Sequence, residues 1–303
     1  MTKGGRGQPR GRHAASGPPR HGPRWATLGA VLGLAAIGPA LVWVLNRGGG
    51  QTGQTAWARL GTSDVHSLAF VGDDANHVLF GHHAGIAESR DGGRTWHSLP
   101  VSQDAMGLRP ADDGSIVIAG HEVFSASRDA GVTWQPIPAD LPSLDIHGFA
   151  RDPGDPARMW VALATGGFWK STDFGIHWTR VRDDGLYSPL AVRTGGTARL
   201  LAVDATGLVA SDDGGRTWRP LTTPPTYPMT ALAATPDGSV LYAGTLDGMY
   251  RSDDAGGTWT ATADKGSAFA IATSPDGAVV AVVSQETEFF RSSDRGATWP
   301  GPD

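Results

Sequence analysis

Side chains that bind metal ions or transfer protons are concentrated in one part of this sequence, between residues 66 and 147. The set consists of His66, His82, His83, Asp104, Met106, His121 and His147. Imidazole, carboxylate and thioether groups are ligands of copper and zinc, and neutral histidine is the commonest metal ligand. The sequence therefore raises the hypothesis of a copper or zinc site with His66, His83, His121 and His147 as ligands.

Two other interpretations of these residues stay open. Buried polar side chains often only bond to the backbone and trapped water, or contact a small ligand, and no spacing such as H-x-x-x-H makes the metal hypothesis specific. A carboxylate beside a histidine can also serve as acid and base, which makes Asp104 and Asp145 weak catalytic candidates. No cofactor is required in either case. The histidines at 77, 97 and 177 are interpreted as surface or repeat residues.

The strands that must position the cluster can be predicted from an octapeptide that occurs six times in the sequence. Its pattern is Ser-x-Asp-x-Gly-x-Thr-Trp, with histidine in place of threonine in the third copy. The copies begin at Ser89, Ser127, Ser171, Ser211, Ser252 and Ser292. Their starts are separated by 38, 44, 40, 41 and 40 residues, which is the length of a four-stranded propeller blade.

The residue types that recur in every copy of the octapeptide have a structural explanation. An aspartate can accept backbone N–H groups of its own turn, and glycine adopts a positive φ without steric cost. The residues interpreted in this way are Asp91, Asp129, Asp173, Asp213, Asp254, Asp294, Trp96, Trp134, Trp178, Trp218, Trp259 and Trp299. We interpret them as structural residues, not as an active site.

Aligning the blades on the octapeptide serine shows where the cluster falls. Counting back 23 residues gives His66 and Asp104, and 24 gives His147, at the first and innermost strand of each blade. Counting back six residues gives His83 and His121, at the loop into the third strand. Blades four to six have no histidine at these places. The alignment therefore predicts a site in half of the ring, near the channel mouth, with Asp104 and Met106 on one strand face.

The ring needs a closing strand, because the last octapeptide ends at Trp299, near the C-terminus. Residues 56–60 resemble a strand that follows an octapeptide, and Trp57 precedes Trp96 by 39 residues. We expect this strand to complete the last blade, which removes the exposed sheet edges. The predicted fold is all-β: a six-bladed β-propeller of four-stranded blades, closed by the N-terminal strand and preceded by one transmembrane helix.

The N-terminal part predicts a membrane anchor. Residues 1–24 form a basic tail with six Lys or Arg and no acidic residue, and residues 25–45 are 21 uncharged residues, enough for one spanning helix. The charge asymmetry places the tail in the cytoplasm and the propeller outside, with the chain single-pass in the cytoplasmic membrane. A cleaved signal peptide is the alternative. Residues 46–55 are then a linker and residues 56–303 the propeller.

The octapeptide, across residues 56–303, is similar to the Asp-box or bacterial neuraminidase repeat of sialidases and photosystem II assembly-factor propellers. The runs Val65-His66, Gly81-His82-His83 and Gly120-His121 resemble membrane-anchored bacterial propellers described as sialidase-like or assembly-factor-like. The resemblance implies the propeller fold, and it makes glycoside hydrolysis of the sialidase type a hypothesis to be tested on the residues. However, the Phe/Tyr-Arg-Ile-Pro tetrapeptide of sialidases is missing, and an arginine triad would have to come from residues such as Arg109, Arg151 and Arg193.

The preferred functional hypothesis is a non-enzymatic, membrane-tethered binding or assembly module for an extracytoplasmic protein or small ligand. A sialidase-like glycoside hydrolase acting on extracytoplasmic glycans is the alternative. The net charge of −5 does not favour a nucleic-acid partner. The chain has no cysteine, which excludes disulfides and thiol catalysis.

Overall fold

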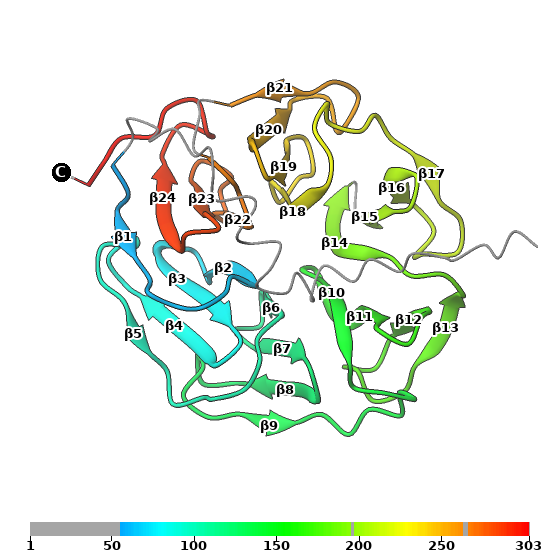
Figure 1. Ribbon diagram of the computed structural model, residues 1–303. Coiled ribbons are helices and arrows are strands. Elements are labelled where there is room, and N and C mark those ends of the chain that lie inside the picture. The colour runs from blue at the N-terminus through cyan, green and yellow to red at the C-terminus, as the bar shows by residue number, and fades with distance from the viewer. Residues whose placement is uncertain (1–54, 195–196, 263–265, 303) are drawn as a thin grey trace, which may run out of the picture. The chain divides into compact units, whose positions relative to one another are not determined.

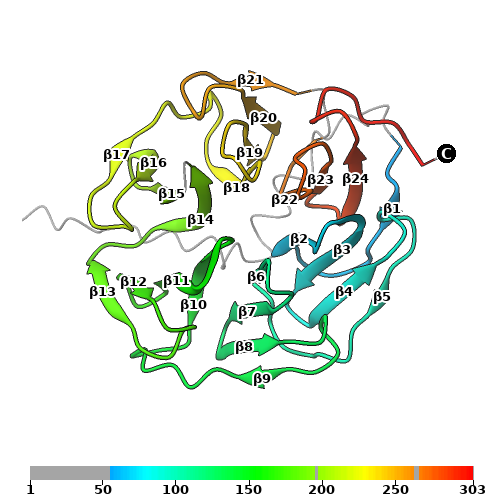
Figure 2. The same cartoon turned by 180° about the vertical axis from the view of Figure 1, so that it is seen from behind.

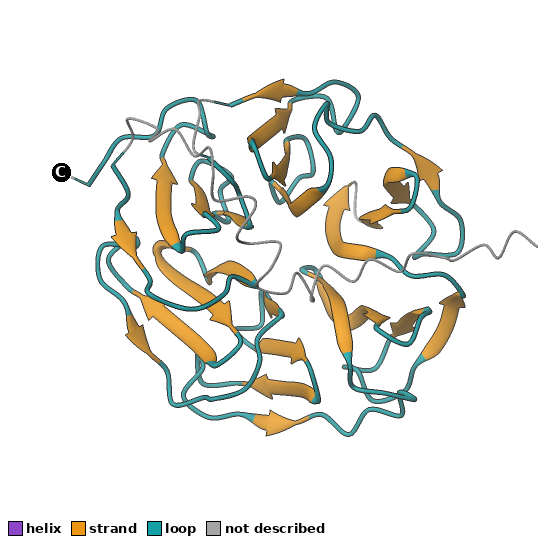
Figure 3. Cartoon of the chain, in the orientation of Figure 1, coloured by secondary structure: helices purple, strands orange, loops and turns teal. Residues whose placement is uncertain are grey.

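The computed structural model describes residues 55–194, 197–262 and 266–302, and these fold as a β-propeller of six four-stranded blades. Figure 1 shows the blades arranged in a ring around a common centre, and Figure 2 shows the same ring from behind. All regular elements of the described residues are strands (Figure 3). The predicted all-β fold, the six blades and the four strands per blade are confirmed.

The strands of the first three blades follow one another in chain order, from the centre of the ring to its rim (Figure 1). Blade one contains β2 (Ser67–Val71), β3 (Asp74–His82), β4 (Gly85–Ser89) and β5 (His97–Ser98). Blade two contains β6 (Gly107–Pro110), β7 (Ile116–Gly120), β8 (Val123–Ser127) and β9 (Gln135–Pro136). Blade three contains β10 (Ile146–Asp152), β11 (Asp155–Leu163), β12 (Phe168–Ser171) and β13 (Thr179–Arg182).

The other three blades repeat this order, except that the last takes its outer strand from the start of the propeller. Blade four contains β14 (Tyr187–Thr194), β15 (Thr197–Asp204), β16 (Gly207–Ser211) and β17 (Arg219–Pro220). Blade five contains β18 (Met229–Ala234), β19 (Leu241–Thr245), β20 (Gly248–Ser252) and β21 (Thr260–Ala261). Blade six contains β22 (Ala270–Thr273), β23 (Val280–Val283), β24 (Glu288–Ser292) and β1 (Ala58–Arg59).

The ring closes where β1 pairs with β24. Ala58 lies opposite Phe289 and Arg59 opposite Glu288, and the two strands are antiparallel. The N–H of Trp57 also donates to the carbonyl of Phe289 at 2.8 Å. The predicted closure by residues 56–60 is therefore confirmed, and the last blade has no unpaired outer edge on β24. The predicted helix 25–45 lies outside the described residues, and none of the residues described forms a helix able to span a membrane.

Each octapeptide ties its own turn together through its aspartate, as the second copy illustrates. Asp129 Oδ1 accepts the backbone N–H of Thr133 at 2.8 Å, and Oδ2 accepts the Thr133 hydroxyl at 2.6 Å. The Ser127 hydroxyl donates to Asp129 Oδ1 at 2.8 Å and accepts the N–H of Gly131 at 2.8 Å. Serine, aspartate and glycine thus satisfy one another within a turn that lies at the rim of the blade.

The glycine of the octapeptide also packs each blade against the one before it. Gly93, at φ +100°, lies under the ring of Phe289, and Gly215, at φ +94°, lies under that of Phe168. A β-carbon at Gly93 would come within 2.0 Å of the phenylalanine ring, so only glycine fits there. The octapeptide tryptophan lies beside the same ring, with Trp96 and Phe289 centroids 5.2 Å apart. The seams between blades therefore form much of the core.

The aspartate bonds make the fold sensitive to acid. Hydrogen bonds from Thr133 and Ser127 lower the pKa of Asp129 to about 2, and those from Thr258 and Ser252 lower the pKa of Asp254 to about 2. A lowered pKa in the folded state contributes stability that is present above the ordinary value of 3.8 and is lost as pH falls towards 2.

We therefore expect the urea midpoint of unfolding, followed by tryptophan fluorescence, to fall steeply between about pH 4 and pH 2. In this range the octapeptide aspartates bind protons in the unfolded chain but remain ionised in the folded one. All six octapeptide aspartates have a lowered pKa: Asp91, Asp129, Asp173, Asp213, Asp254 and Asp294. A midpoint that stays constant down to pH 2 would show that these bonds do not stabilise the fold.

Candidate metal centre

The histidine cluster lies at the end of the channel where the first strand of each blade begins. His66 immediately precedes β2, and its N–H donates to the carbonyl of Gly81 at the end of β3. His83 and His121 occupy the turns that lead into β4 and β8. Because the first and second strands are antiparallel, a residue at the start of one and a turn residue after the other lie at the same end of the blade.

Close approach of neighbouring blades brings these residues together. The N–H of Ala105, just before β6, donates to the carbonyl of His82 in blade one at 3.3 Å, and the Ser67 hydroxyl donates to the carbonyl of Ala105 at 2.7 Å. A β-carbon at Gly81 would lie 2.5 Å from the carbonyl oxygen of Ala105, so glycine at this position is required for the contact. Asp104 of blade two is thereby held against blade one.

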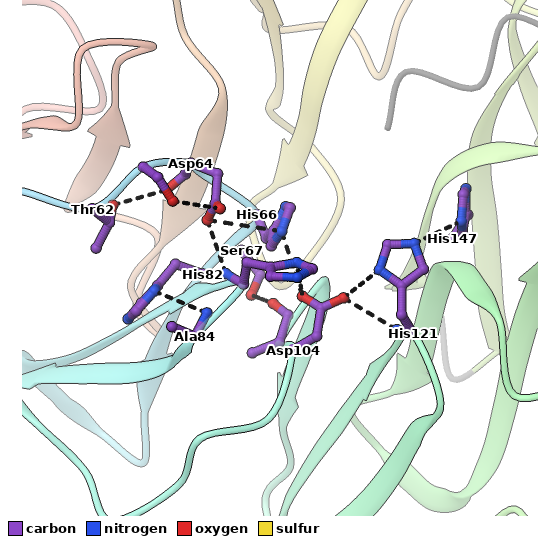
Figure 4. Close-up of polar contacts among 12 residues, drawn as sticks. Thr62, Asp64, His66, Ser67, His82, Ala84, Asp104, His121 and His147 are labelled. Carbon is purple, nitrogen blue, oxygen red and sulfur yellow. Dashed lines mark hydrogen bonds and ion pairs between the residues drawn. The ribbon is translucent and has the colours of Figure 1, made fainter. Parts of the chain in front are cut away.

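Asp104 lies at the centre of the cluster, between His66 on one side and His121 on the other (Figure 4). Its carboxylate is buried, with 6% of the side chain exposed. Oδ2 accepts hydrogen bonds from His121 Nδ1 at 2.7 Å and from the His121 N–H at 3.1 Å. Oδ1 lies 3.4 Å from His66 Nε2 and 3.7 Å from His83 Nδ1. Asp104 therefore contacts histidines from two blades through different oxygens.

On the side of the His121 ring that is turned away from Asp104, three potential ligand atoms lie close together. His121 Nε2 is 3.1 Å from His147 Nε2 and 3.6 Å from Asp145 Oδ1, and His147 Nε2 is 3.1 Å from the same oxygen. All three side chains are partly exposed, so solvent reaches them. When His121 Nδ1 donates to Asp104, the lone pair of the neutral ring is on Nε2, which then faces this set. We call His121, His147 and Asp145 the three-ligand set.

A second set of potential ligand atoms lies on the other side of Asp104. Asp64 Oδ1 is 3.9 Å from His66 Nε2 and accepts the backbone N–H of His83 at 2.8 Å. The ligand atoms of Asp64, His66 and His83 all lie within 4.8 Å of one another. Burial lowers the pKa of His66, so this histidine stays neutral near pH 7 and able to bind a metal.

Asp64 was not predicted, although the sequence contains a signal for it. Asp64 precedes His66 by two residues, as Asp145 precedes His147, so the pattern Asp-x-His occurs in blades one and three. Blade two has Asp104 in the place of the histidine. Comparison of these three blades would have placed Asp64 beside the cluster.

His82 differs from the other predicted histidines, and the strand face predicted for Asp104 and Met106 is wrong. His82 is the last residue of β3; its ring stacks on Phe80 with centroids 5.8 Å apart, and Nδ1 accepts the N–H of Ala84. Asp104 and Met106 both precede β6, which begins at Gly107. The strand alternation that placed their side chains on one face therefore does not apply to them.

His77 differs from its interpretation as a surface residue, because only 7% of it is exposed. Its Nε2 lies 2.7 Å from Oε1 of the buried Glu88, whose other oxygen is 3.0 Å from His97 Nε2. Arg90 also forms an ion pair with Glu88, at 2.7 Å. The group is thus a satisfied polar network within blade one.

The arginines required by the hydrolase alternative lie away from the histidines. Arg109 pairs with Val117 and Arg151 with Met159, towards the ends of β6 and β10 that are opposite to the cluster. The Arg151 guanidinium donates to the carbonyl and hydroxyl of Ser115 in the β6–β7 turn. Arg193 lies 3.9 Å from Asp112 of that same turn. Arg151 and Arg193 thus face the β6–β7 turn and not the histidine cluster.

Comparison with known proteins gives structural matches only. No protein-family description and no curated protein matches the chain. A GH74 xyloglucanase from Xanthomonas campestris superposes with a TM-score of 0.55 at 19% identity, over 80% of this chain and 46% of that one. YCF48 from Cyanidioschyzon merolae gives 0.51 at 18% identity, over 81% and 87%. YCF48 bound to a D1 peptide gives 0.51 at 19% identity, over 80% and 83%.

The chain spans less than half the length of the xyloglucanase that it matches. All of these identities are below 20%, where likeness of structure carries no information about the reaction or the ligand. The matched propellers include both a glycoside hydrolase and a protein solved with a bound peptide. The comparisons therefore establish that this chain has the fold of these β-propellers, and they establish the fold alone.

Proposed function

We propose that this chain is a membrane-tethered, extracytoplasmic binding module that binds a transition-metal ion, zinc or copper, at the histidine end of its channel. The observation that carries the proposal is the geometry of the three-ligand set, with separations of 3.1, 3.1 and 3.6 Å between its nitrogen and oxygen atoms. Ligand atoms about 2.0–2.2 Å from a tetrahedral zinc ion are about 3.3–3.6 Å apart, so small movements suffice for binding.

The surroundings of the three-ligand set support the same chemistry. Two imidazoles and one carboxylate leave a fourth coordination position open, as in zinc sites that exchange ligands with solvent. His121 is oriented by Asp104 through its other nitrogen, and such a carboxylate fixes the tautomer and raises the basicity of a metal-bound histidine. Magnesium and calcium are poor candidates because they prefer oxygen ligands throughout.

The binding role rests on the residues and not on the fold neighbours. The octapeptide is similar to the Asp-box repeat, which occurs on propellers with unrelated activities, so it favours no single reaction. The open position on the metal would be available to a side chain of an extracytoplasmic protein or to a small ligand. The membrane anchor, predicted from residues 25–45, would hold the propeller at the surface where such partners occur.

Calorimetric titration of the purified full-length chain tests the proposal. We expect saturable binding of Zn²⁺ and Cu²⁺ and none of Mg²⁺, since the set contains two imidazoles. His121→Ala and His147→Ala should each weaken zinc binding at the three-ligand set at least about 100-fold, because each removes one of its three ligands.

His177→Thr is the matched control, because it removes an exposed histidine and restores the threonine of the other five octapeptides. It should bind zinc as the unchanged chain does. Thermal unfolding of every variant shows whether the fold is retained. A folded His147→Ala chain that binds the same number of zinc ions, with the same affinities, as the unchanged chain would contradict the proposal.

A further inference from the structure

Two buried polar atoms on the other side of Asp104 have no hydrogen-bond partner among the described residues. They are His66 Nε2 and Asp104 Oδ1, and they lie 3.4 Å apart. The side chain of Asp104 is more than nine-tenths buried. Buried polar atoms of folded proteins are almost always paired, because an unpaired one costs free energy of desolvation. This pair of atoms therefore points to a ligand that interacts with both.

Two more ligand atoms face the same place. Asp64 Oδ1 lies 3.9 Å from His66 Nε2, and His83 Nδ1 lies 3.7 Å from Asp104 Oδ1. Asp64 also accepts the backbone N–H of His83, which fixes the turn that carries this histidine. The three separations of 3.4, 3.7 and 3.9 Å are close to the distance of about 3.3–3.6 Å between ligand atoms of a tetrahedral zinc ion, so rotation of the exposed His83 side chain can bring two imidazole nitrogens and two carboxylate oxygens around one ion. The His83 side chain is 64% exposed, so the ion can enter from solvent.

We infer that a second metal ion binds among Asp64, His66, His83 and Asp104, and that Asp104 couples it to the ion of the three-ligand set. The inference rests on the proposed function, because the second ion is coupled to the first. Asp104 Oδ1 would bind the second ion, while Oδ2 accepts Nδ1–H of His121. One carboxylate thus serves as a ligand on one side and orients a ligand on the other.

An ion bound on one side of Asp104 should weaken the binding of an ion on the other side. A cation on Oδ1 withdraws negative charge from the carboxylate, so Oδ2 becomes a weaker acceptor for His121 Nδ1–H. His121 Nε2 is then a weaker ligand, because the basicity of a metal-bound histidine depends on the partner of its other nitrogen. Repulsion between the ions adds to this effect. The coupling is reciprocal, and we expect each ion to bind about tenfold more weakly when the other is present.

Equilibrium dialysis of the full-length chain against Zn²⁺, with metal counted by mass spectrometry, tests the inference. We expect two ions per chain at saturation, taken up in two phases about tenfold apart in affinity. His66→Gln and His147→Gln should each leave one ion, taken up in a single phase. His177→Thr, as control, should keep two.

The outcomes separate the two claims. A single ion that His147→Gln removes and His66→Gln does not affect would overturn the second site and leave the proposed function intact. No bound ion would overturn both. If His66→Gln fails to fold, His83→Ala replaces it, because its side chain is largely exposed and contributes little to packing. That variant should weaken one ion at least about tenfold and leave the other unchanged; two ions bound with unchanged affinities would overturn the inference.

Discussion

Replacement of Asp104 by asparagine is expected to remove one zinc ion from the chain and to weaken the other about 10–100-fold. The amide keeps the shape of the carboxylate, and its oxygen can still accept the two hydrogen bonds from His121. Its –NH₂ group would face His66 Nε2, which has no hydrogen-bond partner in the described structure, and would donate to it. The variant should therefore retain the fold while it loses the charge on which both sets depend.

Zinc dialysis and thermal unfolding of Asp104→Asn measure these effects separately. We expect the unfolding temperature without metal to be unchanged or raised, because a buried unpaired nitrogen gains a donor. Asp64→Asn is the matched comparison: it should cost only the ion beside His66 and leave the ion of His121 and His147. An Asp104→Asn chain that binds two ions with unchanged affinities would show that this carboxylate is not part of a metal site.

Replacement of Phe289 by alanine is expected to cost about 3–5 kcal/mol of unfolding free energy, as for other fully buried aromatic side chains. Phe289 lies on β24, at the seam where blade six meets blade one, and none of it is exposed. Its ring covers Gly93 and packs edge-on against Trp96. Alanine would leave a cavity that the rigid octapeptide turn cannot fill.

Phe168→Ala is the matched control, because Phe168 is equally buried and packs in the same way on Gly215 and Trp218 at the seam between blades three and four. Urea unfolding should give similar losses for the two variants if the ring is closed. A loss below about 1 kcal/mol for Phe289→Ala alone would mean that blades six and one are not packed together in solution.

Much of the fold could be predicted because its repeating unit is held by local contacts. Ser127, Asp129, Gly131 and Thr133 bond to one another within seven residues, so the sequence that forms the turn is contiguous and visible. The closing strand could be predicted because residues 56–60 have the register of a strand that follows an octapeptide. The role of the octapeptide glycine at the seams could not, since Gly93 and Phe289 are distant in sequence.

The site was predicted in position but not in geometry. Counting from the octapeptide places His66, His83, Asp104, His121 and His147 at one end of the channel, because the octapeptides are separated by a nearly constant 38–44 residues. Side-chain direction depends on local departures from regularity, such as the register shift between Ile146 and Gly148 around His147. Adjacent residues therefore differ: His83 faces Asp104, whereas His82 stacks on Phe80.

Anomalous diffraction at the zinc absorption edge, from crystals of the chain grown with zinc, tests the central claim most directly. We expect a strong peak about 2.0–2.2 Å from Nε2 of His121, Nε2 of His147 and Oδ1 of Asp145. A second peak among Asp64, His66, His83 and Asp104 would support the two-ion arrangement. Zinc found only at other residues, or His121 and His147 bonded to each other with no peak between them, would contradict the account and assign these histidines a structural role.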